Sequence, residues 1–257
     1  MAREKTEREI QNLKNRLQDL ADKSFQQNVF TFTGFLGLGD QDVFWQEEAK
    51  LRYAGYQLWG GCENADRLIV RFGSPDTMGY EVPFPIVCIH IRPLAQKFAD
   101  ELSHRDFLGA LMNLGIERGV LGDIKVGEKQ AYLFCLDSIG EFICGNLEQV
   151  KHTSVKCTIT EDYQCVPEEE PDVVKIQVPS LRVDAVLAKV YNMSREKSLE
   201  LFRAGKVYLD GRLCGNCSRQ LKAGETINAR GYGKFTLRGE QGETKKGRLV
   251  VEAAVYR

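Results

Sequence analysis

The sequence predicts an α+β protein made of three successive regions. Residues 4–23 carry apolar side chains at helical spacing. Residues 86–159 alternate strand-like and helix-like segments in the order βαββαβ, and residues 181–237 follow the order helix, helix, hairpin, strand. These patterns divide the chain into an N-terminal mixed helical region (1–78), a middle region (79–162), an acidic linker (163–178) and a C-terminal region (179–257).

The composition is that of a globular protein, with 43% hydrophobic and 28% charged residues, but the charge is unevenly spread. From residue 175 onward, 17 lysines and arginines stand against 8 acidic residues, whereas residues 1–174 hold 18 against 28. A basic C-terminal third indicates a polyanionic partner. The chain opens without a signal peptide and has no run of ~20 apolar residues, so we expect a cytoplasmic protein without a membrane span.

The N-terminal region is expected to hold two helices and at least one strand. Residues 30–33 form a short strand or a loop, and residues 68–72 form an apolar strand. Asp40 is expected to cap the second helix, which ends near Gly55. The pair Gly60-Gly61 indicates a tight turn or a close approach of the backbone. One face of the first helix carries Ile10, Leu13, Leu17 and Leu20.

The middle region is expected to be a ferredoxin-like split βαβ unit, with two helices on one face of a four-stranded antiparallel sheet. RNA-recognition domains share this RRM-like topology, but the third strand lacks their glycine–aromatic signature. We therefore interpret Tyr132 and Phe134 as packing residues, and RNA contact by this region remains the minor alternative. The expected strands are residues 86–91, 121–126, 131–136 and 155–159, and the expected helices are residues 106–114 and 139–150.

The C-terminal region begins with two helices. Ser194 is a good N-cap for the second one, and Gly205 is the residue type that ends helices in a left-handed conformation. Asp210-Gly211 predicts a type I′ turn between two short strands. A polar loop at residues 239–247 and a closing strand at 249–255 follow. The apolar stripe of the first helix is Val183, Val186, Leu187 and Val190.

This region resembles the S4 RNA-binding domain. The matching residues are Arg182-Val-Asp184, Ser194-Arg195, the stretch from Gly205 to Gly211, Ser218, and Leu221-Lys-Ala-Gly-Glu225. The resemblance implies RNA contacts through the start of the first helix, the second helix and the loop after it. By position, the implied RNA-binding residues are Arg182, Ser194, Arg195, Lys197, Lys206, Ser218, Arg219 and Lys222.

With two further stretches, nearly the whole chain resembles the YlmH family of bacterial S4-domain proteins. These stretches are residues 105–124 and the run Gly60-Gly-Cys-Glu-Asn-Ala-Asp-Arg67. The family typically has Tyr at Cys62 and Glu at Asp66. The resemblance implies a ribosome-associated RNA-binding protein of Gram-positive-type bacteria. It would act on large ribosomal subunits that still hold a stalled nascent chain, and its gene would lie among cell-division genes.

Other chemistries have weaker support. Cys214-Gly-Asn-Cys217 is a lone CxxC that follows a strand, so we interpret it as an incidental pair, with a metal or redox role as the outside alternative. His104-Arg105-Asp106 matches the start of a kinase catalytic loop, but no glycine-rich phosphate loop accompanies it. No catalytic residue, metal site or cofactor is therefore predicted.

The sequence thus predicts a non-enzymatic, monomeric RNA-binding protein. We expect it to dock through its S4 domain on ribosomal RNA of the large subunit, near tRNA, and to assist the rescue of stalled nascent-chain complexes. Two alternatives stay open: an S4-targeted RNA-modifying enzyme of the pseudouridine synthase kind, and a cell-division interaction protein whose basic region meets a partner or a membrane surface.

Overall fold

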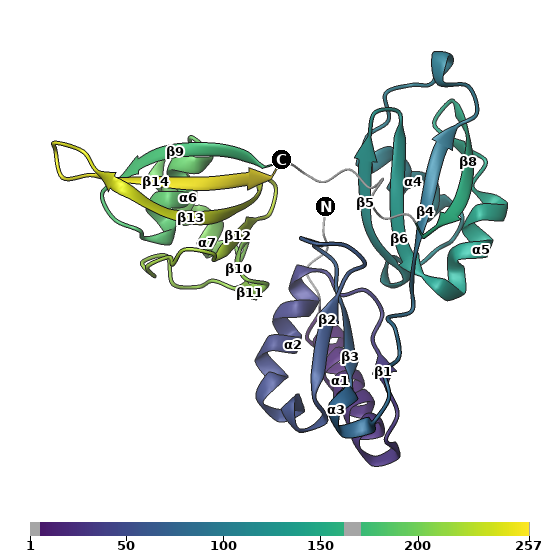
Figure 1. Ribbon diagram of the computed structural model, residues 1–257. Coiled ribbons are helices and arrows are strands. Elements are labelled where there is room, and N and C mark those ends of the chain that lie inside the picture. Colours follow the sequence, from purple (N-terminus) through teal and green to yellow (C-terminus); the bar gives the residue numbers. More distant parts are fainter. Residues whose placement is uncertain (1–5, 162–170, 257) are drawn as a thin grey trace. The chain divides into compact units, whose positions relative to one another are not determined.

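The computed structural model describes residues 6–161 and 171–256, which belong to two compact units, Met1–Pro167 and Glu168–Arg257 (Figure 1). Each unit combines helices with antiparallel β-sheets. The first unit contains both the N-terminal and the middle regions, and the second contains the C-terminal region.

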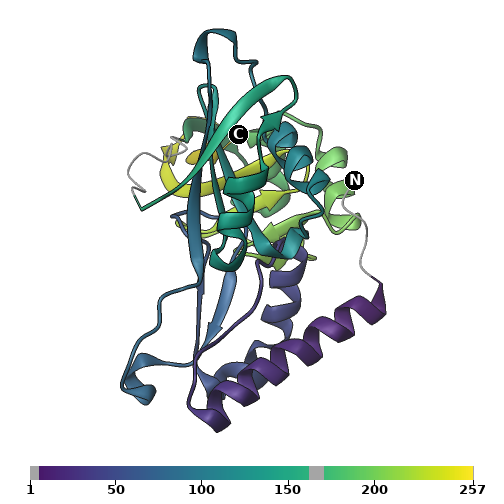
Figure 2. The same cartoon turned by 90° about the vertical axis from the view of Figure 1, so that its right-hand side faces the viewer.

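The N-terminal region packs two helices against a small sheet. Helix α1 spans Glu7–Gln27 and begins with a capping box between Thr6 and Glu9. Helix α2 spans Leu38–Leu51 and continues into the 3₁₀ helix η1, Arg52–Ala54. Figure 2 shows α1 as the long helix at the edge of this unit. The sheet has the order β1-β3-β2, with β1 at Thr31–Phe32, β2 at Tyr56–Trp59 and β3 at Ile69–Phe72, before the short helix α3 at Pro75–Met78.

The expected cap at Asp40 is wrong. Gly37 occupies the N-cap position of α2, and Asp40 lies inside the first turn. An acidic residue there still stabilises the helix, because the helix dipole favours negative charge near the N-terminus. The sequence pattern misplaced the start of the helix by three residues, and the expected end near Gly55 is the end of η1, which continues α2.

The middle region forms a five-stranded antiparallel sheet in the order β5-β6-β4-β8-β7. The predicted order strand, helix, strand, strand, helix, strand is present, with β7 as an addition before the last strand. The expected helix at 139–150 ends earlier, at Asn146, and its last residues form β7. The elements are β4 (Ile86–Pro93), the 3₁₀ helix η2 (Gln96–Phe98), α4 (His104–Asn113), the 3₁₀ helix η3 (Arg118–Val120), β5 (Leu121–Gly127), β6 (Gln130–Leu136), α5 (Asp137–Asn146), β7 (Gln149–Val150) and β8 (Thr153–Thr160).

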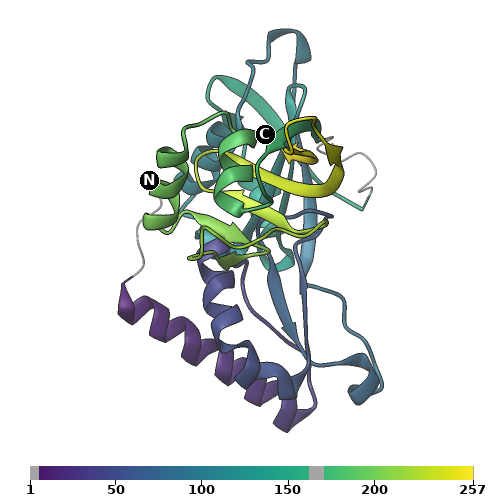
Figure 3. The ribbon, with the colours of Figure 1, turned by 90° about the vertical axis from the view of Figure 1, so that its left-hand side faces the viewer.

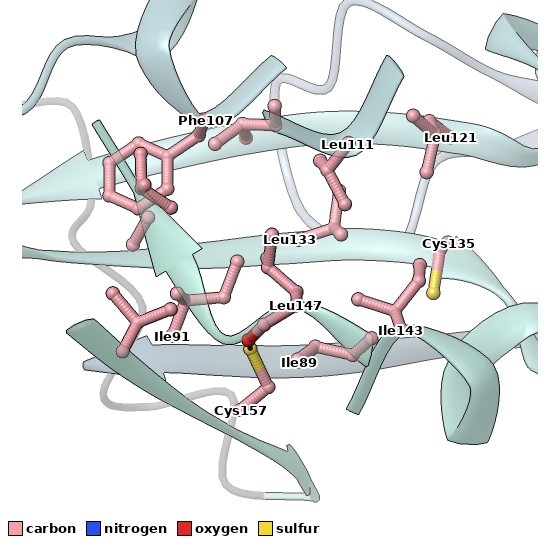
Figure 4. Packing of buried hydrophobic residues seen from close by; sticks show 14 of the residues in the cluster. Ile89, Ile91, Phe107, Leu111, Leu121, Leu133, Cys135, Ile143, Leu147 and Cys157 are labelled. Carbon is pink, nitrogen blue, oxygen red and sulfur yellow. Dashed lines mark hydrogen bonds between the residues drawn. The ribbon is translucent and has the colours of Figure 1, made fainter. Parts of the chain in front are cut away.

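One face of this sheet carries the core of the middle region. Figure 4 shows side chains of α4 and α5, such as Phe107 and Ile143, meeting Ile89 and Leu133 of the sheet. These four side chains are at most 1% exposed. Residues of one strand alternate between the two faces of a sheet, so the alternate positions of β4, β6 and β8 point away from this core.

The other face of the sheet is partly covered by the N-terminal region. Phe35 and Ile69 pack on Cys88, Tyr132 and Phe134, and all five are buried. This packing joins the two regions into one unit. It also confirms Tyr132 and Phe134 as packing residues, at 3% and 0% exposure.

The segment between β2 and β3 stabilises the contact between the N-terminal region and the middle sheet. Gly61 has φ +97°, and its bare Cα lies against the ring of Phe134. Arg67 donates to the backbone carbonyls of Phe35, Arg118 and Leu121 at 2.8–2.9 Å. The backbone amides of Asp66 and Arg67 donate to the carboxylate of Asp123. The close backbone approach expected at Gly60-Gly61 is therefore confirmed.

The C-terminal unit is a six-stranded antiparallel sheet in the order β11-β10-β12-β13-β14-β9, with two helices packed on it (Figure 3). The turn at Asp210-Gly211 has φ of +47° and +78°, as a type I′ turn requires. Ser194 caps α7 and Gly205 follows it with φ +61°, as predicted. The elements are β9 (Asp172–Val178), α6 (Val183–Val190), α7 (Arg195–Arg203), β10 (Val207–Leu209), β11 (Arg212–Leu213), β12 (Thr226–Ala229), β13 (Gly233–Glu243) and β14 (Leu249–Tyr256).

Two sequence assignments in this unit are wrong. Residues 172–178 are not linker, because they form β9 and pair along their whole length with β14. Residues 239–243 are not loop, because they continue β13 through two register shifts. In both places the strand is held by its partner across the sheet, which local composition does not report. Residues 163–170 of the expected acidic linker lie outside the described residues.

The buried cysteines lead to a chemical prediction. Burial raises the pKa of Cys88, Cys135 and Cys157 to about 12, so each thiol is protonated at neutral pH. We expect iodoacetamide to modify these three more than about a hundredfold more slowly than the half-exposed Cys217, since the thiolate is the nucleophile. Peptide mass spectrometry after a short treatment of the native protein measures this. Equal labelling of Cys135 and Cys217 would show that the sheet core opens readily.

Candidate nucleic-acid interface

A buried carboxylate organises the start of α6. Asp184 is 0% exposed, in the first turn of the helix. Arg182, at the N-cap position, donates to both of its oxygens, from Nε at 3.0 Å and Nη2 at 2.9 Å. Arg195, the first residue of α7, donates to the same carboxylate from Nη2 at 3.4 Å. Two guanidinium groups therefore converge on one fixed acceptor.

The electrostatics of this cluster favour the charged forms of Asp184 and Arg182. Burial would raise the pKa of Asp184, but the hydrogen bonds from Arg182 and the charges of both arginines outweigh burial and lower that pKa below its usual value. The hydrogen bond to Asp184 likewise raises the pKa of Arg182. The side chains of Arg182 and Arg195 are 31% and 68% exposed, so their remaining N–H groups face solvent.

Helix α7 is joined to α6 beside this cluster. The hydroxyl of Ser194 accepts a hydrogen bond from the backbone amide of Lys197 at 3.1 Å. The buried hydroxyl of Ser198 donates to the carbonyl of Asp184 at 3.0 Å. Lys197 pairs with Glu200 at 2.9 Å, with both side chains about half exposed. Such a surface pair contributes little to stability, so Lys197 can exchange its partner for another anion.

The loop after β11 lies along the start of α6. The carbonyls of Cys217 and Arg219 accept hydrogen bonds from the backbone amides of Asp184 (3.1 Å) and Val183 (2.9 Å). These bonds satisfy two amides that a helix start leaves without an intrahelical partner. They also place Ser218, which is exposed, beside the arginine cluster.

Glu225 shapes the same loop. Its carboxylate accepts a hydrogen bond from Arg219 Nη2 at 2.7 Å and one from the backbone amide of Lys222 at 2.8 Å. The side chain of Lys222 is exposed and forms no ion pair with any residue that the structure describes. The loop therefore holds one paired and one unpaired cation.

The structure brings most, but not all, of the predicted residues together. Arg182, Arg195, Ser218 and Arg219 gather at the start of α6. Lys206 does not join them, because it follows α7, and nine helical residues span roughly 13 Å. It is exposed on the strand side of Gly205.

Sequence reasoning missed the two acids that arrange these cations. Asp184 and Glu225 belong to the matched stretches, but their roles become visible only through their contacts. The sequence did contain a signal for the role of Asp184 as a partner of arginine. Asp184 is an acidic residue in the first turn of a mostly apolar helix, directly after Arg182-Val183.

Other candidate residues have structural contacts. Asp210 accepts a hydrogen bond from the amide of Thr226 at 2.9 Å and belongs to the hairpin turn. Asp106 forms a capping box with Ser103 and pairs with Lys151 at 2.9 Å. The hydrogen bonds from Ser103, followed by the one from Lys151, lower the pKa of Asp106 to about 2, and Asp106 completes the capping box at the start of α4.

The CxxC pair shows contacts to its own loop. The thiol of Cys214 lies 3.7 Å from the carbonyl of Asn216, and that of Cys217 lies 3.9 Å from the hydroxyl of Ser218. Within residues 6–161 and 171–256, no three His, Cys, Asp or Glu side chains gather as metal ligands. No helix in these ranges is long and apolar enough to cross a membrane.

The chain is similar to known proteins. Residues 80–163 match a family described as "Putative RNA-binding domain in YlmH". The chain is 29% identical over 197 residues to "Ribosome-associated protein quality control protein P2" of Bacillus subtilis (strain 168), covering 75% of this chain and 74% of that protein.

A solved structure also matches, the "Cell division protein ylmH from Streptococcus pneumoniae". It has 17% sequence identity and a TM-score of 0.47, and the match covers 65% of this chain and 100% of that one. The family match includes the motif at residues 105–124. The predicted resemblance to the YlmH family is confirmed by the family match and the Bacillus relative.

Proposed function

We propose that the protein is a non-enzymatic, cytoplasmic RNA-binding factor that docks on ribosomal RNA of the large subunit through its C-terminal unit. The observation that carries this proposal is the pair of guanidinium groups held on buried Asp184 at the start of α6. Folded RNA is recognised mainly through phosphates, 2′-hydroxyls and shape, and arginines on a rigid surface suit bidentate phosphate contacts.

The fold assignments belong to the same proposal. The strand order β5-β6-β4-β8 with two helices on one face supports an RRM-like domain at residues 79–162. The order helix, helix, hairpin, strand and the cations of α6, α7 and the β11–β12 loop support an S4 domain within residues 179–257. The printed name of the Bacillus relative supports a role in ribosome-associated quality control. The protein would assist the rescue of stalled nascent chains, near tRNA and as a monomer.

Arg182 is unsuitable for testing this proposal by itself. Removing it takes both bidentate hydrogen bonds from a buried carboxylate, so the variant would lose stability as well as charge. Arg195, Lys206 and Lys222 are more exposed, and their loss leaves the bond between Arg182 and Asp184 intact.

The test is co-sedimentation of the full chain with purified bacterial large subunits at several salt concentrations. We expect R195Q/K206Q/K222Q to bind more weakly, and the slope of log K against log [salt] to fall by about two to three, since each lost phosphate contact removes ~0.7–0.9. The matched control is K245Q/K246Q/R248Q, which removes the same charge from the exposed β13–β14 turn. Undiminished binding and an unchanged slope of the first variant would overturn the proposal.

A further inference from the structure

The outward face of the middle sheet is divided into two parts. Around Cys88, Tyr132 and Phe134 it is covered by Phe35 and Ile69 of the N-terminal region. Tyr132 stacks on His90 with ring centroids 4.5 Å apart, and His90 shares a hydrogen bond with Gln130 at 2.8 Å. The aromatic residues of this face are thus engaged within the protein, and RNA bases cannot stack on them.

Beyond this cover the face is open and cationic. Strands β4 and β8 pair so that Arg92 lies directly opposite Lys156, and both side chains are exposed. Arg92 is near the end of β4 that leads to η2, away from the end where the strand begins. Neither side chain forms an ion pair with any residue among 6–161 and 171–256. Next to them on the same face lie Thr158, opposite His90, and Ser154.

A like-charged pair at this position is unfavourable for the fold by itself. Directly opposite residues of an antiparallel pair have their Cα atoms roughly 5 Å apart, and like charges there are destabilising. The outward positions of β4, β6 and β8 contain no carboxylate to offset the repulsion. Yet residues 1–174 as a whole carry 28 acidic against 18 basic side chains. The absence of acids from the outward positions of these three strands therefore stands out against the composition around them.

We propose that Arg92 and Lys156 form a second RNA-contact surface, which binds backbone phosphates rather than bases. The pair presents two unneutralised cations on rigid strands, flanked by the hydroxyl residues Ser154 and Thr158, which can donate hydrogen bonds to phosphate oxygens. Phosphate contacts carry no sequence information, so this surface adds affinity and orientation to the docking of the C-terminal unit. The inference rests on the proposal that the protein binds RNA.

The experiment compares full-length R92Q/K156Q with the wild type in binding to purified large ribosomal subunits, from roughly 50 to 200 mM salt. Loss of two phosphate contacts lowers the slope of log K against log [salt] by about 1.5. The factor by which the affinity falls over this salt range therefore becomes about tenfold smaller. The matched control is R16Q/K23Q, which removes one arginine and one lysine from exposed positions of α1. Thermal unfolding followed by tryptophan fluorescence checks the fold, and R92Q/K156Q should melt at or above the wild-type temperature because a repulsion is removed.

The outcomes separate this inference from the docking proposal. Weaker binding and a lower slope for R92Q/K156Q, with R16Q/K23Q unchanged, support the sheet surface. Wild-type binding of R92Q/K156Q overturns it, and the docking proposal stands if R195Q/K206Q/K222Q still loses affinity. If R92Q/K156Q loses affinity while R195Q/K206Q/K222Q binds normally, the sheet surface stands and docking through the C-terminal unit is overturned.

Discussion

Replacing Asp184 with alanine should destabilise the C-terminal unit by about 3 kcal/mol. The substitution removes the acceptor of three hydrogen bonds from charged groups, and bonds of this kind contribute about 1.5–3 kcal/mol. The side chains of Arg182 and Arg195 keep their access to water, so the cost stays below that of stranding a fully buried charge.

The two units allow a clean measurement of this effect. Both tryptophans of the chain, Trp45 and Trp59, lie in the first unit, so their fluorescence reports only that unit. Hydrogen exchange of α6 and α7 in increasing urea reports the second. We expect exchange in these helices to accelerate in D184A while the tryptophan transition is unchanged. The control E200A removes only an exposed pair and should cost less than about 0.5 kcal/mol. Equal effects of D184A and E200A would contradict the role given to Asp184.

The same carboxylate makes a pH-dependent contribution. Its pKa is lowered in the folded protein, so its stabilisation is fully present above the unfolded pKa, about 3.9, and is lost as the pH falls through the folded value. The difference in stability between wild type and D184A should therefore be constant near neutral pH and shrink below about pH 4. A difference that persists unchanged in acid would mean that packing, rather than charge, carries the effect.

Replacing Gly61 with alanine should destabilise the first unit by about 3 kcal/mol. Its φ of +97° is strained for any residue with a Cβ, which costs about 1–2 kcal/mol. The added Cβ would also overlap the ring of Phe134, which is 0% exposed, and would lie 3.1 Å from Ile86 Cγ2. Overpacking of this kind costs about 1–3 kcal/mol, because the ring cannot move without displacing its neighbours.

Gly79 provides the matched control for this prediction. It also has a positive φ, +75°, but an added Cβ meets no atom within 4 Å in the described part of the chain. G79A should therefore cost only the backbone strain, about 1 kcal/mol. Urea unfolding followed by tryptophan fluorescence compares the two variants. If G61A lowered the free energy of unfolding no more than G79A, the packing of the N-terminal region on the sheet would not depend on this close approach.

The covered sheet face changes how the middle region can contact RNA. RNA-recognition domains, which share this strand order, bind bases on exposed aromatic residues of their sheet. Here the corresponding side chains, Tyr132 and Phe134, are buried under the N-terminal region. The exposed residues on that face include Arg92 and Lys156 with the hydroxyl residues Ser154 and Thr158 beside them, which favours contacts to phosphates.

Local sequence patterns were sufficient to predict the caps of α7 and the hairpin turn after it, which are set by neighbouring residues. The capping role of Ser194, the left-handed Gly205 and the Asp210-Gly211 turn depend on one or two residues and their neighbours. The order of strands and helices in the middle region followed from hydrophobic periodicity. Strand β9 did not, since it exists by pairing with β14, far along the chain. The second half of β13 did not either, since it continues along β14 only through two register shifts.

The candidate site shows the same division. The sequence by itself determined which residues are cationic and that they cluster in the C-terminal third, in an order that resembles the S4 pattern. Only the tertiary structure decided that Arg182 and Arg195 converge on Asp184, that Glu225 holds Arg219, and that Lys206 stands apart. The physical reason is range: helix caps and turns are set by neighbouring residues, whereas the partner of a charged side chain is set by the packing of distant segments.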